Sequence, residues 1–352
     1  LERKKRGSSP KFLIRSGKVR IPSNFQKFLC NGENKERLFS LMEEVWIEHK
    51  ELIGNRTVFF ARGKQCTKIT FDSFEMIMEL ETNHEEADTK IAYLTQHALM
   101  NNDVNEVCVR SSSGDIDILV IMIGIFGCSN NYIVVDNGTG KSRRKIRIDS
   151  STLSERHQKA LVGFHAFTGN DYVSSFMRKT KKLWKKVDGD EFMIDFFCKL
   201  GNENLTNDLY KNAEKCVCKL YGNNLLENVN DLRSKLYWNF VKKNGKVPDL
   251  SLLPPCSSSL KKHTARSHYI ASIWKKAFIP YQNIDTFSNF GWFPDGKIDW
   301  IDRAYPENVE LLFSEKNSQE TSDEQDCEDE EDDEDSDYDD EDDDDEEDDI
   351  ET

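Results

Sequence analysis

The chain has 352 residues, which is enough for one large domain or two of ordinary size. Its formal charge of −16 comes from one end: 25 acidic residues lie between Glu320 and Glu351, and the rest of the chain has 39 acidic against 48 basic residues. The nine cysteines are scattered and form no CxxC pair, which argues against a disulfide framework or a zinc site. The longest apolar run, Ile116 to Cys128, is too short to span a bilayer.

The first 187 residues alternate between helical and extended patterns. Residues 1–30 are predicted to be a basic, irregular arm in which Lys4-Lys5-Arg6 is either an import signal or a solvated cluster. Asp117 to Phe126 fits a strand or a helix, because periodicity does not separate short apolar runs. The remaining predicted elements are a helix over 34–52, a strand over 57–61, a helix over 86–100, a strand over 106–110, a hairpin of 132–135 with 144–148, and a helix over 152–168.

This order of elements predicts an α/β fold with a mostly parallel sheet, a three-layer domain over residues 31–187. Residues 188–313 are predicted to be helical, with aromatic and aliphatic residues such as Leu225 and Trp238 in the core of a bundle. Residues 314–352 are predicted to be a disordered acidic tail, since they contain too few apolar residues to form a core.

Three acidic segments stand at junctions between predicted elements: Glu86-Ala87-Asp88, Asp115-Ile116-Asp117 and Gly169-Asn170-Asp171. Each has a simpler interpretation. Glu85 and Glu86 have the spacing of a capping box after Thr82 and Asn83, and the other acids suit turns or helix ends. Capping alone is the commoner explanation of the first segment.

Taken together, the three segments predict a shared site. We expect Glu86 and Asp88 to face one point at a helix start, and Asp115 and Asp117 to share a face as an extended pair. Chemistry in open α/β sheets lies beyond the carboxyl ends of the strands, where Asp171 could join them. Five close carboxylates would repel one another, and Mg²⁺ or Mn²⁺ would relieve that repulsion. Two such ions suit in-line hydrolysis of a phosphodiester.

The acidic segments resemble, in order and interval, the motifs of the PIN-like/flap-endonuclease (XPG-type) nuclease superfamily. That resemblance implies a metal-dependent nuclease in which Glu86, Asp88, Asp115, Asp117 and Asp171 are the catalytic residues and ligands of two Mg²⁺ or Mn²⁺ ions. The longer pattern also resembles uncharacterised animal PIN-like proteins, some of mobile-element type. This resemblance is carried by His84 to Thr89, Gly138 to Lys141, Phe164 to Asp171 and Gly291-Trp292. The superfamily uses further aspartates on an earlier strand, which we expect either to precede Leu1 or to be absent.

Basic residues predict a nucleic-acid partner, DNA or RNA. The candidate phosphate contacts are Lys179, Lys181, Lys182, Lys185, Arg143 and Arg144. Gly138 to Ser142 is similar to a phosphate loop, but Val135 stands where that motif needs glycine, so a hairpin turn is the better interpretation. The acidic tail is expected to bind basic proteins or the basic body of the chain.

Two other functions stay open. The same fold could bind nucleic acid or a protein without turnover, or Asp115 could be the nucleophile of a phosphatase with Asp117 as its acid/base.

The cysteine usage indicates a reducing, intracellular compartment, and the basic arm favours the nucleus over the cytoplasm. No membrane partner is expected.

Overall fold

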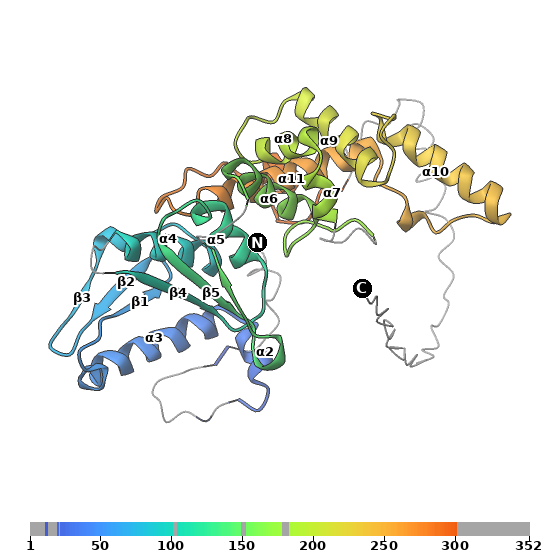
Figure 1. Cartoon of the computed structure of the whole chain (residues 1–352). Coiled ribbons are helices and arrows are strands. Elements are labelled where there is room, and N and C mark those ends of the chain that lie inside the picture. Colours follow the sequence, from blue (N-terminus) through green and yellow to red (C-terminus); the bar gives the residue numbers. More distant parts are fainter. Residues whose placement is uncertain are drawn as a thin grey trace, which may run out of the picture. The chain divides into compact units, whose positions relative to one another are not determined.

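The computed structural model describes residues 11–12, 20, 22–100, 104–148, 153–177 and 183–300 (Figure 1). The predicted import signal and the predicted acidic tail lie outside the described residues, as do Lys179, Lys181 and Lys182. Within the range predicted as an irregular arm, residues 25–29 form a helix that begins where the Asn24 side chain accepts a hydrogen bond from the backbone of Lys27.

The fold is mixed α/β, as the sequence predicts. The described helices are α2 (Phe25–Leu29), α3 (Gly32–Glu48), α4 (Ala87–Leu99), α5 (Asp117–Phe126), α6 (Glu155–Thr168), α7 (Trp184–Asp188), α8 (Glu191–Lys199), α9 (Asn207–Leu220), α10 (Val229–Asn244) and α11 (Ser257–Lys275). The described strands are β1 (Val58–Arg62), β2 (Gln65–Ile69), β3 (Phe74–Met76), β4 (Glu106–Ser111), β5 (Tyr132–Asn137) and β6 (Arg144–Arg147). No helix in the described part of the chain is long and apolar enough to cross a bilayer.

The described strands form two small sheets. In the first, β1, β2 and β3 are all antiparallel; in the second, β4 and β5 are parallel and β5 and β6 antiparallel. The prediction of a mostly parallel sheet is therefore wrong for these strands. One reason is that residues 117–126 form α5 and not a strand; another is that a tight turn at Gly138–Ser142 sends β6 straight back along β5.

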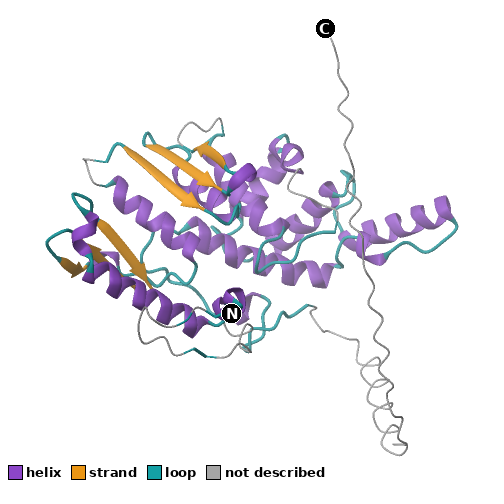
Figure 2. Ribbon diagram, turned by 90° about the horizontal axis from the view of Figure 1, so that it is seen from below, coloured by secondary structure: helices purple, strands orange, loops and turns teal. Residues whose placement is uncertain are grey.

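Helices cover one face of the second sheet (Figure 2). Val109, Ile133 and Val135 point into the core on that face, while the alternate residues of β4 to β6 are mostly exposed. This alternation follows from the period of two along a strand. The carboxyl ends of β4 and β5 are the ends nearest the predicted acidic site.

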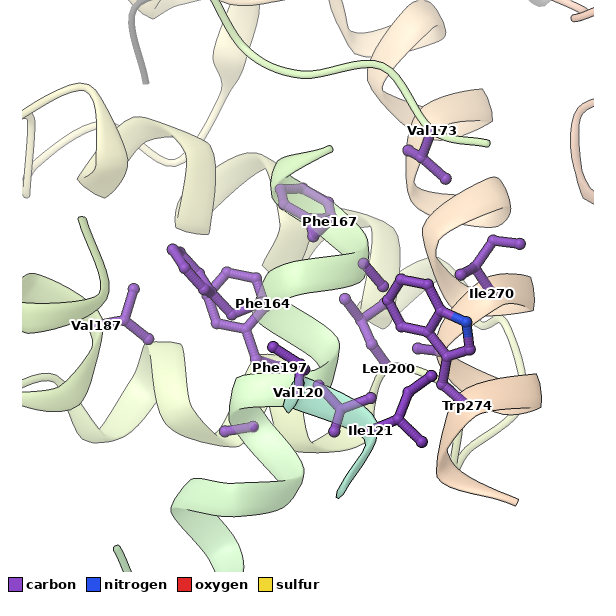
Figure 3. Packing of buried hydrophobic residues seen from close by; sticks show 14 of the residues in the cluster. Val120, Ile121, Phe164, Phe167, Val173, Val187, Phe197, Leu200, Ile270 and Trp274 are labelled. Carbon is purple, nitrogen blue, oxygen red and sulfur yellow. The ribbon is translucent and has the colours of Figure 1, made fainter. Parts of the chain in front are cut away.

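Helix α6 runs through the middle of the core and contacts α5, α8 and α11. Phe164 and Phe167 extend from it toward Phe197 of α8, and Trp274 of α11 packs on its other side (Figure 3). Gly163 lets the two backbones approach closely, since a Cβ there would lie 2.0 Å from the carbonyl oxygen of Phe197. Any larger residue at Gly163 would force α6 and α8 apart.

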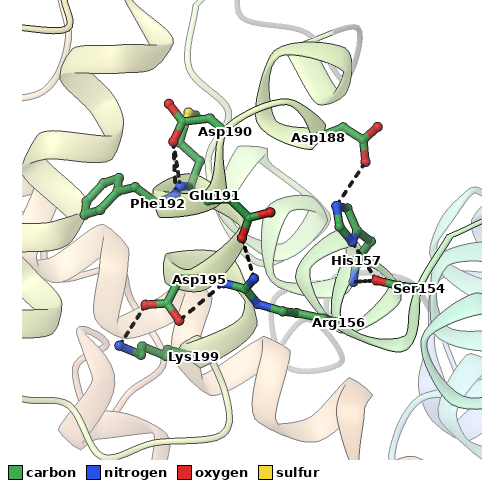
Figure 4. A network of polar contacts seen from close by, with 10 residues as sticks. Ser154, Arg156, His157, Asp188, Asp190, Glu191, Phe192, Asp195 and Lys199 are labelled. Carbon is green, nitrogen blue, oxygen red and sulfur yellow. Dashed lines mark hydrogen bonds and ion pairs between the residues drawn. The ribbon is translucent and has the colours of Figure 1, made fainter.

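Polar contacts fasten the start of α6 to α8 (Figure 4). The Ser154 side chain caps α6 through the backbone of His157, and the Asp190 side chain caps α8. Arg156 on α6 pairs with Glu191 at 2.5 Å and with Asp195 at 3.7 Å. The amino-terminal end of α6 is thus fixed, which helps to hold its carboxyl-terminal end in place beside the acidic residues.

The predicted core of the helical region is correct only in part. Leu225 is 88% exposed and Trp238 is 57% exposed, whereas Trp274 is fully buried. Helix α10 buries only Val229 and Leu232, because it packs mainly on α9 at its amino-terminal end. The apolar character of a residue on α10 therefore does not predict that its side chain is buried.

Candidate carboxylate site

Glu86 precedes α4 and turns away from it. It is the N-cap residue of α4 and has extended backbone angles, but no side chain caps this helix. The capping-box interpretation is thus wrong, and Asn83 instead bonds through its amide to the backbone of Gln282. The Glu86 carboxylate accepts a hydrogen bond of 3.1 Å from the indole nitrogen of Trp274. Its side chain is therefore directed at the core helix α11.

Asp115 and Asp117 lie where the chain passes from β4 into α5. Strand β4 ends at Ser111 and Asp117 is the first residue of α5, so the predicted extended pair is wrong. Asp115 Oδ1 accepts from the backbone N–H of Asp117 at 3.0 Å, and its carbonyl accepts from Asn137 Nδ2 at 2.9 Å. This local bonding is the turn role that is the simpler interpretation of Asp115.

Asp117 is paired with a buried histidine. Its Oδ1 lies 2.5 Å from Nε2 of His165, whose side chain is only 4% exposed. When Asp117 is ionised, this contact requires the proton of His165 to be on Nε2, because a carboxylate only accepts hydrogen bonds. The His165 ring also stacks on Trp274, with ring centroids 5.6 Å apart. His165 therefore orients Asp117, and Trp274 contacts both His165 and Glu86.

Gly169 and Asn170 explain why an apolar helix is followed by Asp171. Gly169 has φ 116° and ψ 141°, which ends α6 in a conformation that residues with a side chain rarely adopt. The Asn170 side chain then donates to the carbonyl of Ala166 and accepts from the N–H of Tyr172 and of Val173. The resulting turn presents Asp171 at the surface beside the other acids.

Electrostatics show that the acids gather. Burial, followed by repulsion from Asp115, Asp117 and Asp171, raises the pKa of Asp88 to about 6. Burial also raises the pKa of Glu86, and hydrogen bonds from Trp274 and Tyr172 oppose that rise while Asp88 and Asp117 add to it. Asp88 is therefore close enough to Asp115, Asp117 and Asp171 to be repelled by them, and Glu86 is close enough to Asp88 and Asp117.

Their present arrangement is not a closed metal cage. Among the described residues, no three His, Cys, Asp or Glu side chains are grouped so that they could hold a metal ion. The donor chemistry nevertheless suits a hard divalent cation, because all five groups are carboxylates.

The candidate phosphate contacts divide into different groups. Arg143 donates from Nε and Nη2 to the buried carboxylate of Asp136, at 2.8 and 2.5 Å, and Arg110 donates to the same group at 2.7 Å. Arg144 and Lys185 are exposed, on β6 and α7 respectively. Arg143 thus has a structural partner in the sheet, while Arg144 and Lys185 remain available as surface cations.

Sequence reasoning missed the role of two residues. The sequence analysis gives no site role to Trp274 or His165, yet both contact site carboxylates. For His165 a signal existed, since it is a titratable residue on the apolar side of α6. The contact of Trp274 with Glu86 joins residues 188 positions apart, and no local pattern indicates it.

Comparison with known proteins gives no relative: no family model matches the chain, and neither do curated proteins or solved structures.

Proposed function

We propose that this protein is a metal-dependent nuclease of PIN-like type that hydrolyses phosphodiester bonds at the carboxylate site. One observation carries the proposal: acids from the starts of α4 and α5 and from the turn after α6 converge, so that Asp88 is repelled by Asp115, Asp117 and Asp171. Such a cluster is costly without a cation and becomes favourable with one. Without a cation, placing these like charges together does not stabilise the fold, so folding alone does not account for the cluster.

The site residues would have different roles. Glu86, Asp88, Asp115, Asp117 and Asp171 would hold one or two Mg²⁺ or Mn²⁺ ions. Bound ions of this kind supply an activated water and neutralise charge on the leaving oxygen. His165 would keep Asp117 oriented, and Trp274 would do the same for Glu86, through the contacts already described. Lys185 and Arg144 are the described cations that could hold the substrate backbone.

Cleavage assays test this proposal. The full chain is incubated with labelled single-stranded, duplex and flapped DNA and RNA, in Mg²⁺, Mn²⁺ or EDTA. We expect cleavage only with a metal and its loss in Asp115→Asn and in Asp171→Asn. Asp72→Asn, which changes an exposed acid in the turn before β3, is the matched control and should keep full activity. The proposal is wrong if the pure protein cuts none of these substrates with either metal.

A second candidate is binding of nucleic acid without turnover. It is favoured by the fact that one oxygen of Asp117 is held by His165 and one of Glu86 by Trp274, which limits how these groups could coordinate an ion. Salt-dependent binding without cleavage in the same assay would select this candidate.

A further inference from the structure

One face of the sheet formed by β4, β5 and β6 is exposed and carries cations. Residues opposite one another across strands share a face, and the register pairs Arg110 with Asp136, Asp136 with Lys145, and Val134 with Arg147. All of these alternate with Val109, Ile133 and Val135, which are buried in the core. The face away from the helices therefore presents Arg110, Lys145 and Arg147, with Asp136 between Arg110 and Lys145 and Glu106 opposite Tyr132.

The arginines on this face are held in place. The Asp136 carboxylate accepts from both Arg110 and Arg143, and hydrogen bonding from Arg143 together with the charge of Arg110 holds its pKa at about 2. Lys145 and Arg147 are exposed beside this group. Arg110, Arg143 and Lys145 thus gather around one buried carboxylate. Together with Arg147 they outnumber Asp136 and the exposed Glu106, so this face has a net positive charge.

An aromatic ring lies among these cations. Tyr132 is 39% exposed at the start of β5, and the guanidinium carbon of Arg147 lies 4.5 Å from the centre of its ring. Exposed aromatic rings on an open sheet, flanked by Arg and Lys, suit the flat face of an unstacked base and the phosphates next to it. A duplex hides the faces of its bases and could use only the cations.

We propose that this face of β4, β5 and β6 binds single-stranded nucleic acid, with Tyr132 stacking on a base and Lys145 and Arg147 contacting phosphates. Strand β5 joins this surface to the carboxylate site, because Asn137 at its end donates to the carbonyl of Asp115 at 2.9 Å. A single strand lying along β5 would therefore run toward the acids. The inference deepens the proposed function, on which it rests, by naming the form of nucleic acid that reaches the site.

Fluorescence anisotropy with labelled oligothymidine tests the inference on the full chain. The buffer contains EDTA, so that binding is measured apart from any metal-dependent cleavage. Tyr132→Ala should weaken binding at least about fivefold, the low end of the loss for one stacked base, and Tyr132→Phe should restore most of it. Phe74→Ala, which removes an exposed aromatic ring from the other sheet, is the matched control and should bind normally.

The salt dependence gives a second readout. Lys145→Gln with Arg147→Gln should lower the slope of log affinity against log salt by about 1.4, at about 0.7 for each lost phosphate contact on a single strand. Arg56→Gln with Lys64→Gln changes two exposed cations near the first sheet and should leave the slope unchanged. Melting curves of each variant show whether it is folded.

The outcomes separate this inference from the proposed function. Unchanged oligothymidine binding in Tyr132→Ala would overturn the inference, even if the protein cleaves nucleic acid. Binding only to duplex, or only to an acidic peptide, would also overturn it. Binding that depends on Tyr132 without any metal-dependent cleavage would support the inference and contradict the nuclease.

Discussion

Replacing Asp88 by Asn should stabilise the metal-free protein at neutral pH. In the folded chain, burial and the charges of Asp115, Asp117 and Asp171 raise the pKa of Asp88 from 3.8 to about 6. A raised carboxyl pKa means that the folded state binds more protons than the unfolded state between these two values. Stability therefore falls as the pH rises through this window, and the cost is fully present above about pH 6.

The size of the effect follows from the structure. A shift of about two pKa units corresponds to an upper limit of about 3 kcal/mol. Asp88 is only partly buried, so screening by solvent reduces this to roughly 1–2 kcal/mol. Asn also loses the favourable interaction of an acid with the first turn of α4, about 0.3–1 kcal/mol. The expected net gain is about 0.5–1 kcal/mol, or roughly 1–3 °C in melting temperature.

Thermal unfolding in EDTA measures this gain, with Asp72→Asn as the control for loss of an exposed acid. The gain should be present at neutral pH and shrink toward about pH 4, where Asp88 is protonated in the folded state. In millimolar Mn²⁺ the wild type should be more stable than Asp88→Asn, because the bound cation would stabilise the wild type more. A loss of stability at neutral pH in EDTA, or a gain that does not depend on pH, would refute the reasoning.

Two further substitutions test the parts that hold the site. Gly169→Ala should destabilise the chain by roughly 2–4 kcal/mol, since it combines backbone strain with a contact; the added Cβ would lie 2.7 Å from Cβ of Ser175. Gly222→Ala, also at positive φ but with no atom within 4 Å of the added Cβ, should cost less, and equal costs in chemical unfolding would contradict the turn geometry. Trp274→Phe should cost about 1–2 kcal/mol in the same assay, because Glu86 loses its indole donor, whereas Trp238→Phe on exposed α10 should be neutral.

The sequence predicts local elements better than it predicts how they are joined. The strand at 106–110 and the hairpin of β5 with β6 are confirmed, because alternation and turn glycines are local signals. The prediction of a mostly parallel sheet was wrong. The run before Phe126, which fits a strand or a helix by its sequence, forms a helix that packs on α4, α6 and α11. Only packing decides between these two outcomes.

The predicted geometry of the carboxylate site differs from the one in the structure. Asp115 and Asp117 were expected to act as an extended pair, yet the Asp115 side chain accepts a hydrogen bond from the backbone N–H of Asp117 in the turn before α5. The turn that presents Asp171 can be understood from Gly169 and Asn170, because their conformational preferences are local. The contacts of His165 and Trp274 depend on α6 and α11 lying together, which no spacing along the chain reveals.

Titration with Mn²⁺ at neutral pH, followed by calorimetry, tests most directly whether the gathered acids share a cation. The account predicts saturable binding to the full chain that is weakened at least about tenfold when Asp115 and Asp171 are both changed to Asn, corresponding to a loss of roughly 1.4 kcal/mol, and that Asp72→Asn leaves intact. No binding at millimolar Mn²⁺, or binding that survives the double substitution, would contradict it.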